Sequence, residues 1–262
     1  TSIEIPASVM NIGAYAFCET GLTSIEIPAS VMNIGAYAFC ETGLTSIEIP
    51  ASVMNIGAYA FWECNNLGCV TFADGSQLST IGEEAFWNSG LTSIEIPASV
   101  TEIKEETFEC CEDLRSVTFA EGSQLKIIGK DAFWGSGLTS IEIPASVIGI
   151  MESAFENCGN LGSVTFAEGS QLIAIGECVF FGTSGLTTIT IPESVRYIGM
   201  FAFCGNFNLK TVVFLSSAPP YHGDCIFEYC ESLEAICVPG GSEDAYKWSW
   251  PEYAQIIRGE NQ

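Results

Sequence analysis

Residues 1–22 read TSIEIPASVMNIGAYAFCETGL, and residues 23–44 repeat them without a single change. The first seventeen residues of this unit return at 45–61, and degraded copies continue to the end of the chain. A fixed period in the low twenties is typical of solenoids, in which each repeat forms one rung and contacts only its neighbours. The sequence therefore predicts a stack of rungs whose function lies on the surface that the stack presents.

Each rung opens with a leucine and an alternating apolar run that ends in proline, as in Leu22, Ile25, Ile27 and Pro28. Such a run indicates a short strand with a firm stop. The rungs begin near residues 1, 22, 44, 67, 91, 114, 138, 161, 186 and 209, and the last rung begins at 233. We predict about eleven rungs with one short parallel strand each, and short strands, turns, 3-10 or helical segments on the other flank. Residues 1–232 would form the solenoid, and residues 233–262 the last rung and a C-terminal cap.

Two further signals recur in the rungs. An Ile-Gly pair follows the strand, as at Ile12-Gly13 and Ile34-Gly35, and the glycine indicates either little room or a positive φ. A phenylalanine closes each rung, and these side chains are expected to stack inside the coil. The column consists of Phe17, Phe39, Phe61, Phe86, Phe108, Phe133, Phe155, Phe180, Phe203 and Phe227.

Two types of rung alternate in the middle of the chain. One reads LTSIEIPASV, at 91–100 and 138–147, and the other reads VTFAxGSQL, at 70–78, 117–125 and 164–172. The second type is longer at the turn after its strand. We therefore expect that edge of the coil to bulge at every other rung.

The pattern Leu-x-x-Ile-x-Ile-Pro, then Ile-Gly-x-x-Ala-Phe, then Cys-x-x-Leu resembles the BspA-like leucine-rich repeats, also called Treponema-pallidum-type, over nearly the whole chain. This resemblance implies a leucine-rich-repeat solenoid that attaches to host matrix, cells or other microbes. Secretion and a cell-surface anchor outside these 262 residues would be consistent with that role. No cap equivalent to the C-terminal one precedes Thr1, so we expect a natural N-terminal part to be missing.

Residues 236–247, ICVPGGSEDAYK, look like the closing cap common in this family. We expect Ser242 to cap a short helix and Pro251 to stop it. Four aromatic side chains are expected to cover the exposed end of the final rung: Tyr246, Trp248, Trp250 and Tyr253.

The chain is strongly acidic, with eight basic and thirty-two acidic residues and a formal net charge of −24. This charge disfavours nucleic acids and anionic membrane surfaces, whose binders need basic patches. No apolar run approaches membrane-spanning length, so we expect no direct membrane insertion. The expected partner is another protein, either a host matrix or cell-surface protein or the subunits of a complex.

Four of the twelve cysteines lie three residues after the column phenylalanine: Cys64, Cys111, Cys158 and Cys230. Threonine, serine or asparagine occupies this position in the other rungs, so it favours a small side chain that hydrogen-bonds a turn. We expect buried free thiols there. Cys18 and Cys40 lie in adjacent rungs, where a disulfide is geometrically possible although side chains in one column point the same way.

The single histidine, His222, is followed by Cys225, Cys230 and Cys237. These four residues would supply zinc ligands, but their spacing matches no common zinc motif. A His222–Cys225 nucleophile pair lacks a third orienting group. We expect no metal, no cofactor and no catalytic residue.

The candidate binding site is the outward position at the centre of each strand, flanked by a column rich in serine and threonine. It comprises Glu4, Glu26, Glu48, Thr71, Glu95, Thr118, Glu142, Thr165 and Thr190. This column is a solvated polar face, a recognition face for a basic or hydroxyl-rich protein surface or a sugar chain, or a site at which Glu4, Glu26 and Glu48 bind a cation. On the opposite flank, Trp62, Trp87 and Trp134 form either a patch or a partly buried row.

The leading hypothesis is therefore a non-enzymatic adhesion or protein-interaction solenoid, secreted or at the cell surface. The alternative is a structural scaffold or assembly subunit of a larger intracellular complex. Free thiols favour the alternative slightly, because oxidising compartments tend to pair cysteines.

Overall fold

The computed structural model describes residues 2–260 and divides into two compact units, Thr1–Leu138 (unit 1) and Thr139–Gln262 (unit 2). Thr1, at the predicted start of the first rung, lies outside the described residues. Both units consist of parallel-strand rungs, about eleven turns in all, which confirms the predicted fold class of a leucine-rich-repeat solenoid. The division of the chain at residue 232 stays a prediction.

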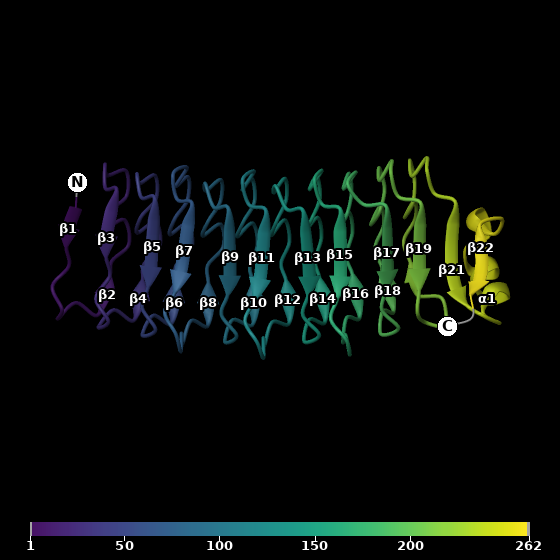
Figure 1. The fold of residues 1–262 in the computed structure, drawn as a ribbon, viewed down its shortest axis with the longest axis horizontal. Helices are drawn as coiled ribbons and strands as arrows, with labels where there is room; N and C mark the ends of the chain where they lie inside the picture. The colour runs from purple at the N-terminus through teal and green to yellow at the C-terminus, as the bar shows by residue number, and fades with distance from the viewer. Residues whose placement is uncertain (1, 261–262) are drawn as a thin grey trace. The chain divides into compact units, whose positions relative to one another are not determined.

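The longer strand of each rung in unit 1 lies on one flank (Figure 1). These strands are β1 (Ser2–Glu4), β3 (Ser24–Glu26), β5 (Ser46–Ile49), β7 (Cys69–Phe72), β9 (Ser93–Ile96) and β11 (Ser116–Phe119). β1 pairs with β3, and β5 to β11 pair in chain order. A second parallel sheet contains the two-residue strands β2 (Asn11–Ile12), β4 (Asn33–Ile34), β6 (Asn55–Ile56), β8 (Thr80–Ile81), β10 (Glu102–Ile103) and β12 (Ile127–Ile128).

Unit 2 repeats this plan and adds the cap. Its longer strands are β13 (Ser140–Ile143), β15 (Ser163–Phe166), β17 (Thr188–Ile191), β19 (Thr211–Phe214) and β21 (Ala235–Pro239). The short strands are β14 (Gly149–Ile150), β16 (Ala174–Ile175), β18 (Tyr197–Ile198) and β20 (Tyr221–His222). The cap comprises α1 (Glu243–Ser249), the 3-10 helix Pro251–Tyr253 and β22 (Ile257–Glu260), which pairs parallel with β21.

The predicted phenylalanine column is confirmed within each unit. From Phe17 to Phe133, consecutive rings stack with centroids 5.2–5.5 Å apart. From Phe155 to Phe227 the spacing is 5.3–5.5 Å. The rings of the interior rungs are completely buried, and a single rung has no means of burying its own ring on both faces. The stack is therefore stable only collectively.

The glycine of the Ile-Gly pair is required by close packing of neighbouring rungs. A Cβ on Gly35 or Gly57 would lie 2.6 Å from a backbone nitrogen of the preceding rung, and one on Gly82 would lie 2.4 Å away. None of these three residues has a positive φ. The sequence leaves two explanations for this glycine, a lack of space and a positive φ. The structure shows that lack of space is the correct one.

The backbone around the phenylalanine column adopts the left-handed conformation at regular positions. Seventeen described non-glycine residues have φ between 49° and 59°, and they lie two residues before or after a column phenylalanine. The N–H groups of Tyr37, Phe39 and Glu41 donate to carbonyls of the next rung at 2.8–3.0 Å. Each left-handed residue costs ~1 kcal/mol, so this conformation persists because the hydrogen bonds between rungs enforce it.

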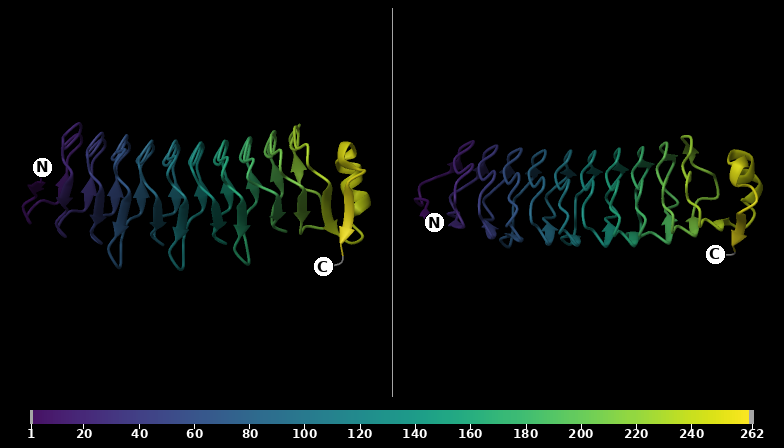
Figure 2. Two further views of the ribbon diagram at one scale, coloured as in Figure 1. Left: turned by 45° about the horizontal axis from the view of Figure 1, so that its top comes forward. Right: turned by 90° about the horizontal axis from the view of Figure 1, so that it is seen from above.

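The expected bulge of alternate rungs is present, since the longer turns extend beyond the shorter ones along one edge of each unit (Figure 2). In the turn Ala167–Ser170, Ser170 N–H donates to Ala167 O at 3.1 Å, and Gly169 has φ +74°. A positive φ at the third position of a turn favours glycine. Ala73–Ser76 forms the same turn, with the same φ at Gly75.

The cap differs from its prediction at two positions. Trp248 is 87% exposed and covers nothing, whereas Tyr246 and Trp250 are completely buried against Phe214. Residues 246 and 250 are one helical turn apart and share a face, but residue 248 points away from it. Ser242 makes no side-chain capping bond; Glu243 instead accepts from Gly241 N–H at 2.7 Å. The helix does end just before Pro251, as predicted.

Candidate functional site

The candidate strand-face column lies on the longer strands, and all nine of its residues are exposed. The strand register places Glu4 opposite Glu26, Glu48 opposite Thr71, and Glu95 opposite Thr118 in unit 1. In unit 2 it places Glu142 opposite Thr165. Apolar residues on both sides of the column point into the core, as in the exposed-buried alternation of β5 and β9. The column is therefore a row of carboxylates and hydroxyls in each unit, free to contact a partner.

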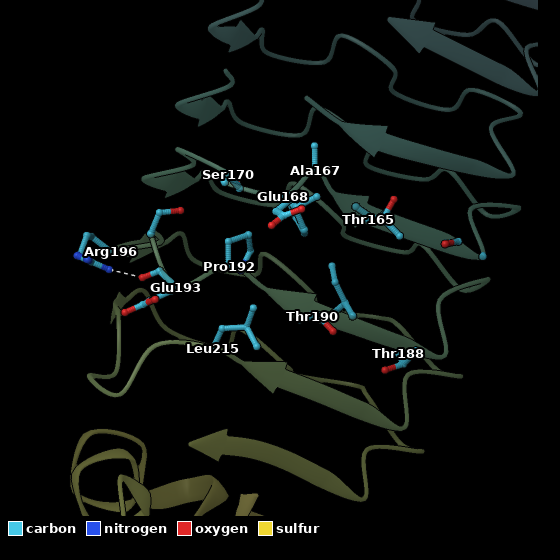
Figure 3. Close-up of a pocket in the computed structure, with 17 residues that line it drawn as sticks. Thr165, Ala167, Glu168, Ser170, Thr188, Thr190, Pro192, Glu193, Arg196 and Leu215 are labelled. Atoms are coloured by element: carbon cyan, nitrogen blue, oxygen red, sulfur yellow. Dashed lines mark hydrogen bonds between the residues drawn. The ribbon is translucent and has the colours of Figure 1, made fainter. Parts of the chain in front are cut away.

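A groove hollows this face in unit 2 (Figure 3). Its volume is about 780 Å³, and it lies between the long turn after β15 and the end of β17. Thr165 and Thr190 of the strand-face column line it, together with Phe166, Pro192 and Leu215. We call it the unit-2 groove.

A groove of the same construction lies in unit 1, between the long turn after β7 and the end of β9. Its volume is about 490 Å³, and its lining includes Thr71, Phe72, Glu95, Pro97 and Ala120. We call it the unit-1 groove. The two grooves recur because the same long turn precedes the same short rung in both places.

The predicted hydrogen-bonding role of the small-residue column is confirmed. The Cys64, Cys111 and Cys230 thiols each donate to the carbonyl of the column phenylalanine in the preceding rung, at 3.0 Å. Thr183 and Asn206 bond phenylalanine carbonyls from the same position. Burial raises the pKa of the Cys111 thiol to about 11. Such thiols stay protonated at neutral pH and act as structural groups.

Cys18 and Cys40, in adjacent rungs, are free thiols in the structure. Burial, followed by a hydrogen bond with the Cys18 thiol, raises the pKa of Cys40 to about 12. The Cys40 thiol is therefore protonated and poorly nucleophilic near neutral pH.

The residues of the hypothetical zinc site are not brought together. His222 Nδ1 lies 2.8 Å from Gly223 O, and Nε2 lies 3.3 Å from Ser249 O. Cys230 donates a hydrogen bond to Phe203 O, and Cys237 is buried in β21.

Among the described residues, one group of three candidate metal ligands has its atoms within 4.8 Å of one another, namely Glu105, Glu106 and Asp131. The Lys130 ammonium lies 3.9 Å from Glu105 and 3.7 Å from Asp131, and it offsets part of their charge.

The flank opposite the strand face carries aromatic stacks in unit 1. Trp62 and Trp87 stack at 5.2 Å and are half-buried, as one of the two interpretations predicted. Trp134 is also half-buried, but Glu109 takes the aromatic position in the rung between Trp87 and Trp134. Burial first, and then the Glu106 carboxylate, raise the pKa of Glu109 to about 7.

Sequence reasoning missed the grooves and the left-handed positions. The glycines of the three VTFAxGSQL segments are the available signal for the grooves, because they predict a projecting turn. Glycine and asparagine at residues 88, 135, 157, 182 and 205 are the signal for the left-handed column, because these two residue types tolerate positive φ best.

Within residues 2–260, no helix has the length and apolar character needed to span a membrane. Leucine-rich-repeat solenoids are generally non-enzymatic folds that bind other proteins, and this chain has such a fold. No curated protein matches the chain in sequence.

Three solved structures are similar to the chain at low sequence identity. A leucine-rich repeat protein from Bacteroides ovatus is 24% identical over 99% of this chain and 77% of its own, with a TM-score of 0.54. The pneumococcal vaccine antigen PcpA is 20% identical over 100% of this chain and 78% of its own, with a TM-score of 0.56. The leucine-rich repeat protein of T. pallidum is 20% identical over 80% of this chain and 87% of its own, with a TM-score of 0.45.

The family model for the BspA type leucine rich repeat region matches the chain in six copies, over residues 1–115, 79–173 and 149–250. These matches include the repeated longer strands up to β21, the phenylalanine column and the helix of the cap. The chain therefore belongs to the BspA-type leucine-rich repeat family.

Proposed function

We propose that this protein is a non-enzymatic adhesion module that binds another protein through the strand-face column. The observation that carries the proposal is the set of exposed carboxylates and hydroxyls of the strand-face column, which lie on parallel strands within each unit. Main-chain bonds hold this row in register, so a partner meets a preorganised surface.

Charge indicates the kind of partner. The net charge of −24 favours a protein with a basic surface, which would be attracted over a distance and bound with a marked salt dependence. Since one protein with this fold is a pneumococcal vaccine antigen, we extend the proposal to display outside the cell, by secretion or attachment to the cell surface.

The test is binding to purified extracellular matrix proteins immobilised on a sensor. We expect the affinity to fall as NaCl is raised, and the double variant Glu26→Lys/Glu48→Lys to lose about tenfold, equivalent to ~1.4 kcal/mol. The matched control is Glu19→Lys/Glu41→Lys, which makes the same charge change at exposed positions away from the strands. Equal losses in the two variants would mean that net charge alone matters, and would overturn the strand-face assignment.

Free thiols such as those of Cys40, Cys64 and Cys111 favour a second candidate, a scaffold subunit inside the cell. Antibody binding to intact cells that express the full-length protein separates the two. Labelling of intact cells supports the adhesion module, whereas labelling only after permeabilisation supports the scaffold.

A further inference from the structure

The floor of the unit-2 groove is apolar. Leu215 is 39% exposed, and it follows Ala167 and Pro192 across three successive rungs at the ends of β15, β17 and β19. Phe166 is half-buried beside them, whereas the isoleucines at the same strand position in neighbouring rungs are buried. Figure 3 shows Pro192 between Glu168 and Leu215. This floor can accommodate an aliphatic or aromatic side chain from outside.

The rim of the groove is acidic on the turn side. Glu168 lies at the apex of the long turn and Glu193 in the following short turn, and both carboxylates are exposed. Thr165, Thr188 and Thr190 place hydroxyls on the strand side (Figure 3). Two carboxylates around an apolar floor complement a segment that carries positive charge beside an apolar side chain.

Arg196 is the one basic residue in the lining of this groove. Its Nη1 donates to Glu193 O at 2.6 Å and to Val195 O at 3.1 Å. These bonds hold the guanidinium against the backbone at the outer edge, beyond Glu193 in Figure 3. It therefore reduces the negative potential at that edge but leaves the apolar floor open.

We infer that the unit-2 groove binds an extended segment of a partner protein, with an apolar side chain on Leu215 and Phe166 and flanking arginines or lysines on Glu168 and Glu193. In an extended chain, residues i and i+2 point to the same face, so the recognised pattern is basic-x-apolar-x-basic. The unit-1 groove binds the same pattern more weakly, because its floor is smaller. This inference rests on the proposed function and specifies the partner.

The experiment is an NMR titration of the whole chain, with labelled methyl groups, using the capped peptide Arg-Ser-Leu-Ser-Arg. We expect the signals of Leu215 and Ala167 to shift first. The peptide with citrulline in place of both arginines keeps the shape but loses the charge, and we expect it to bind at least about fivefold more weakly. The peptide Arg-Ser-Ser-Ser-Arg, which lacks the apolar side chain, is expected to shift neither signal.

The variant Glu168→Gln/Glu193→Gln is expected to weaken binding by a similar factor, and its matched control is Glu152→Gln/Glu177→Gln, at exposed positions outside the groove. Shifts spread evenly over the acidic surface, or equal binding of the citrulline peptide, would overturn the inference. If the peptide does not bind the unit-2 groove, partner binding that depends on Glu26 and Glu48 is still expected. The two proposals therefore fail separately.

Discussion

The two units share a backbone but differ in what that backbone displays. The unit-1 and unit-2 grooves are both formed by an Ala-x-Gly-Ser turn over a short rung, yet their volumes are about 490 and 780 Å³. The third rung contributes Ala120 in one groove and Leu215 in the other. Exposed positions therefore vary in chemistry while the buried ones keep the coil unchanged.

The carboxylates of the two grooves are also arranged differently. Unit 1 has one on the turn, Asp74, and one on the strand, Glu95, whereas both carboxylates of unit 2, Glu168 and Glu193, lie on turns. Two carboxylates on one rim favour a ligand with two cationic groups, one on each side of an apolar side chain. The comparison indicates that sequence differences at exposed sites change how well each groove suits a given ligand.

The largest expected effect distinguishes the phenylalanine column from the floor of the unit-2 groove. Phe180→Ala removes a completely buried ring in unit 2 and is expected to destabilise by about 3–5 kcal/mol. Phe166→Ala removes a half-buried ring and is expected to cost about 1–2 kcal/mol, because part of that ring already contacts water. Urea unfolding followed by circular dichroism measures both. Equal losses would mean that Phe166 belongs to the core and that the groove has no apolar floor.

The next effect tests whether the two long turns are equivalent. Gly75→Val and Gly169→Val each force a β-branched residue into positive φ, and we expect each to destabilise by roughly 1–2 kcal/mol. Gly75→Asn and Gly169→Asn are milder controls, because asparagine tolerates this conformation. If the free energy of unfolding fell for one variant but not for the other, the two long turns would not share one backbone conformation.

Leu215 and Ala120 occupy equivalent positions in the two grooves. Changing each of them tests whether they cause the difference in volume and affinity between the grooves. Leu215→Ala is expected to weaken the unit-2 groove for Arg-Ser-Leu-Ser-Arg by about fivefold, roughly 1 kcal/mol of apolar contact. Ala120→Leu is expected to strengthen the unit-1 groove by a similar factor. NMR titration reads both grooves in one sample. If neither affinity moves, the volume difference between the grooves has no role in binding.

The smallest effect concerns pH and the flank of unit 1. Folding raises the pKa of Glu109 from 4.5 to about 7, so the folded state holds this proton more tightly than the unfolded state. This stabilisation is complete below pH 4.5 and is lost as the pH rises through 7. Glu109→Gln is expected to flatten the fall of stability in that window. Glu121→Gln, on an exposed turn, is the charge-matched control, and a parallel change in both variants would refute the role of Glu109.

The sequence alone determined the coil. An exact repeat of twenty-two residues, with a leucine, two isoleucines and a phenylalanine in constant register, leaves one arrangement that buries all of them, namely parallel rungs with aligned aromatic rings. The exposed strand-face column follows from the same alternation, because neighbours of buried strand residues point outward.

The tertiary structure decided what depends on contacts between rungs. The left-handed backbone at Tyr37 and Glu41 opposes local preference and is maintained by hydrogen bonds to the next rung. The helix of the cap selects Tyr246 and Trp250 for burial and leaves Trp248 in solvent. The unit-2 groove joins Phe166, Pro192 and Leu215 from three rungs, about twenty-five residues apart in sequence. Periodicity specifies which residues share a column, but the shape of a surface depends on how side chains of adjacent rungs fill or leave the space between them.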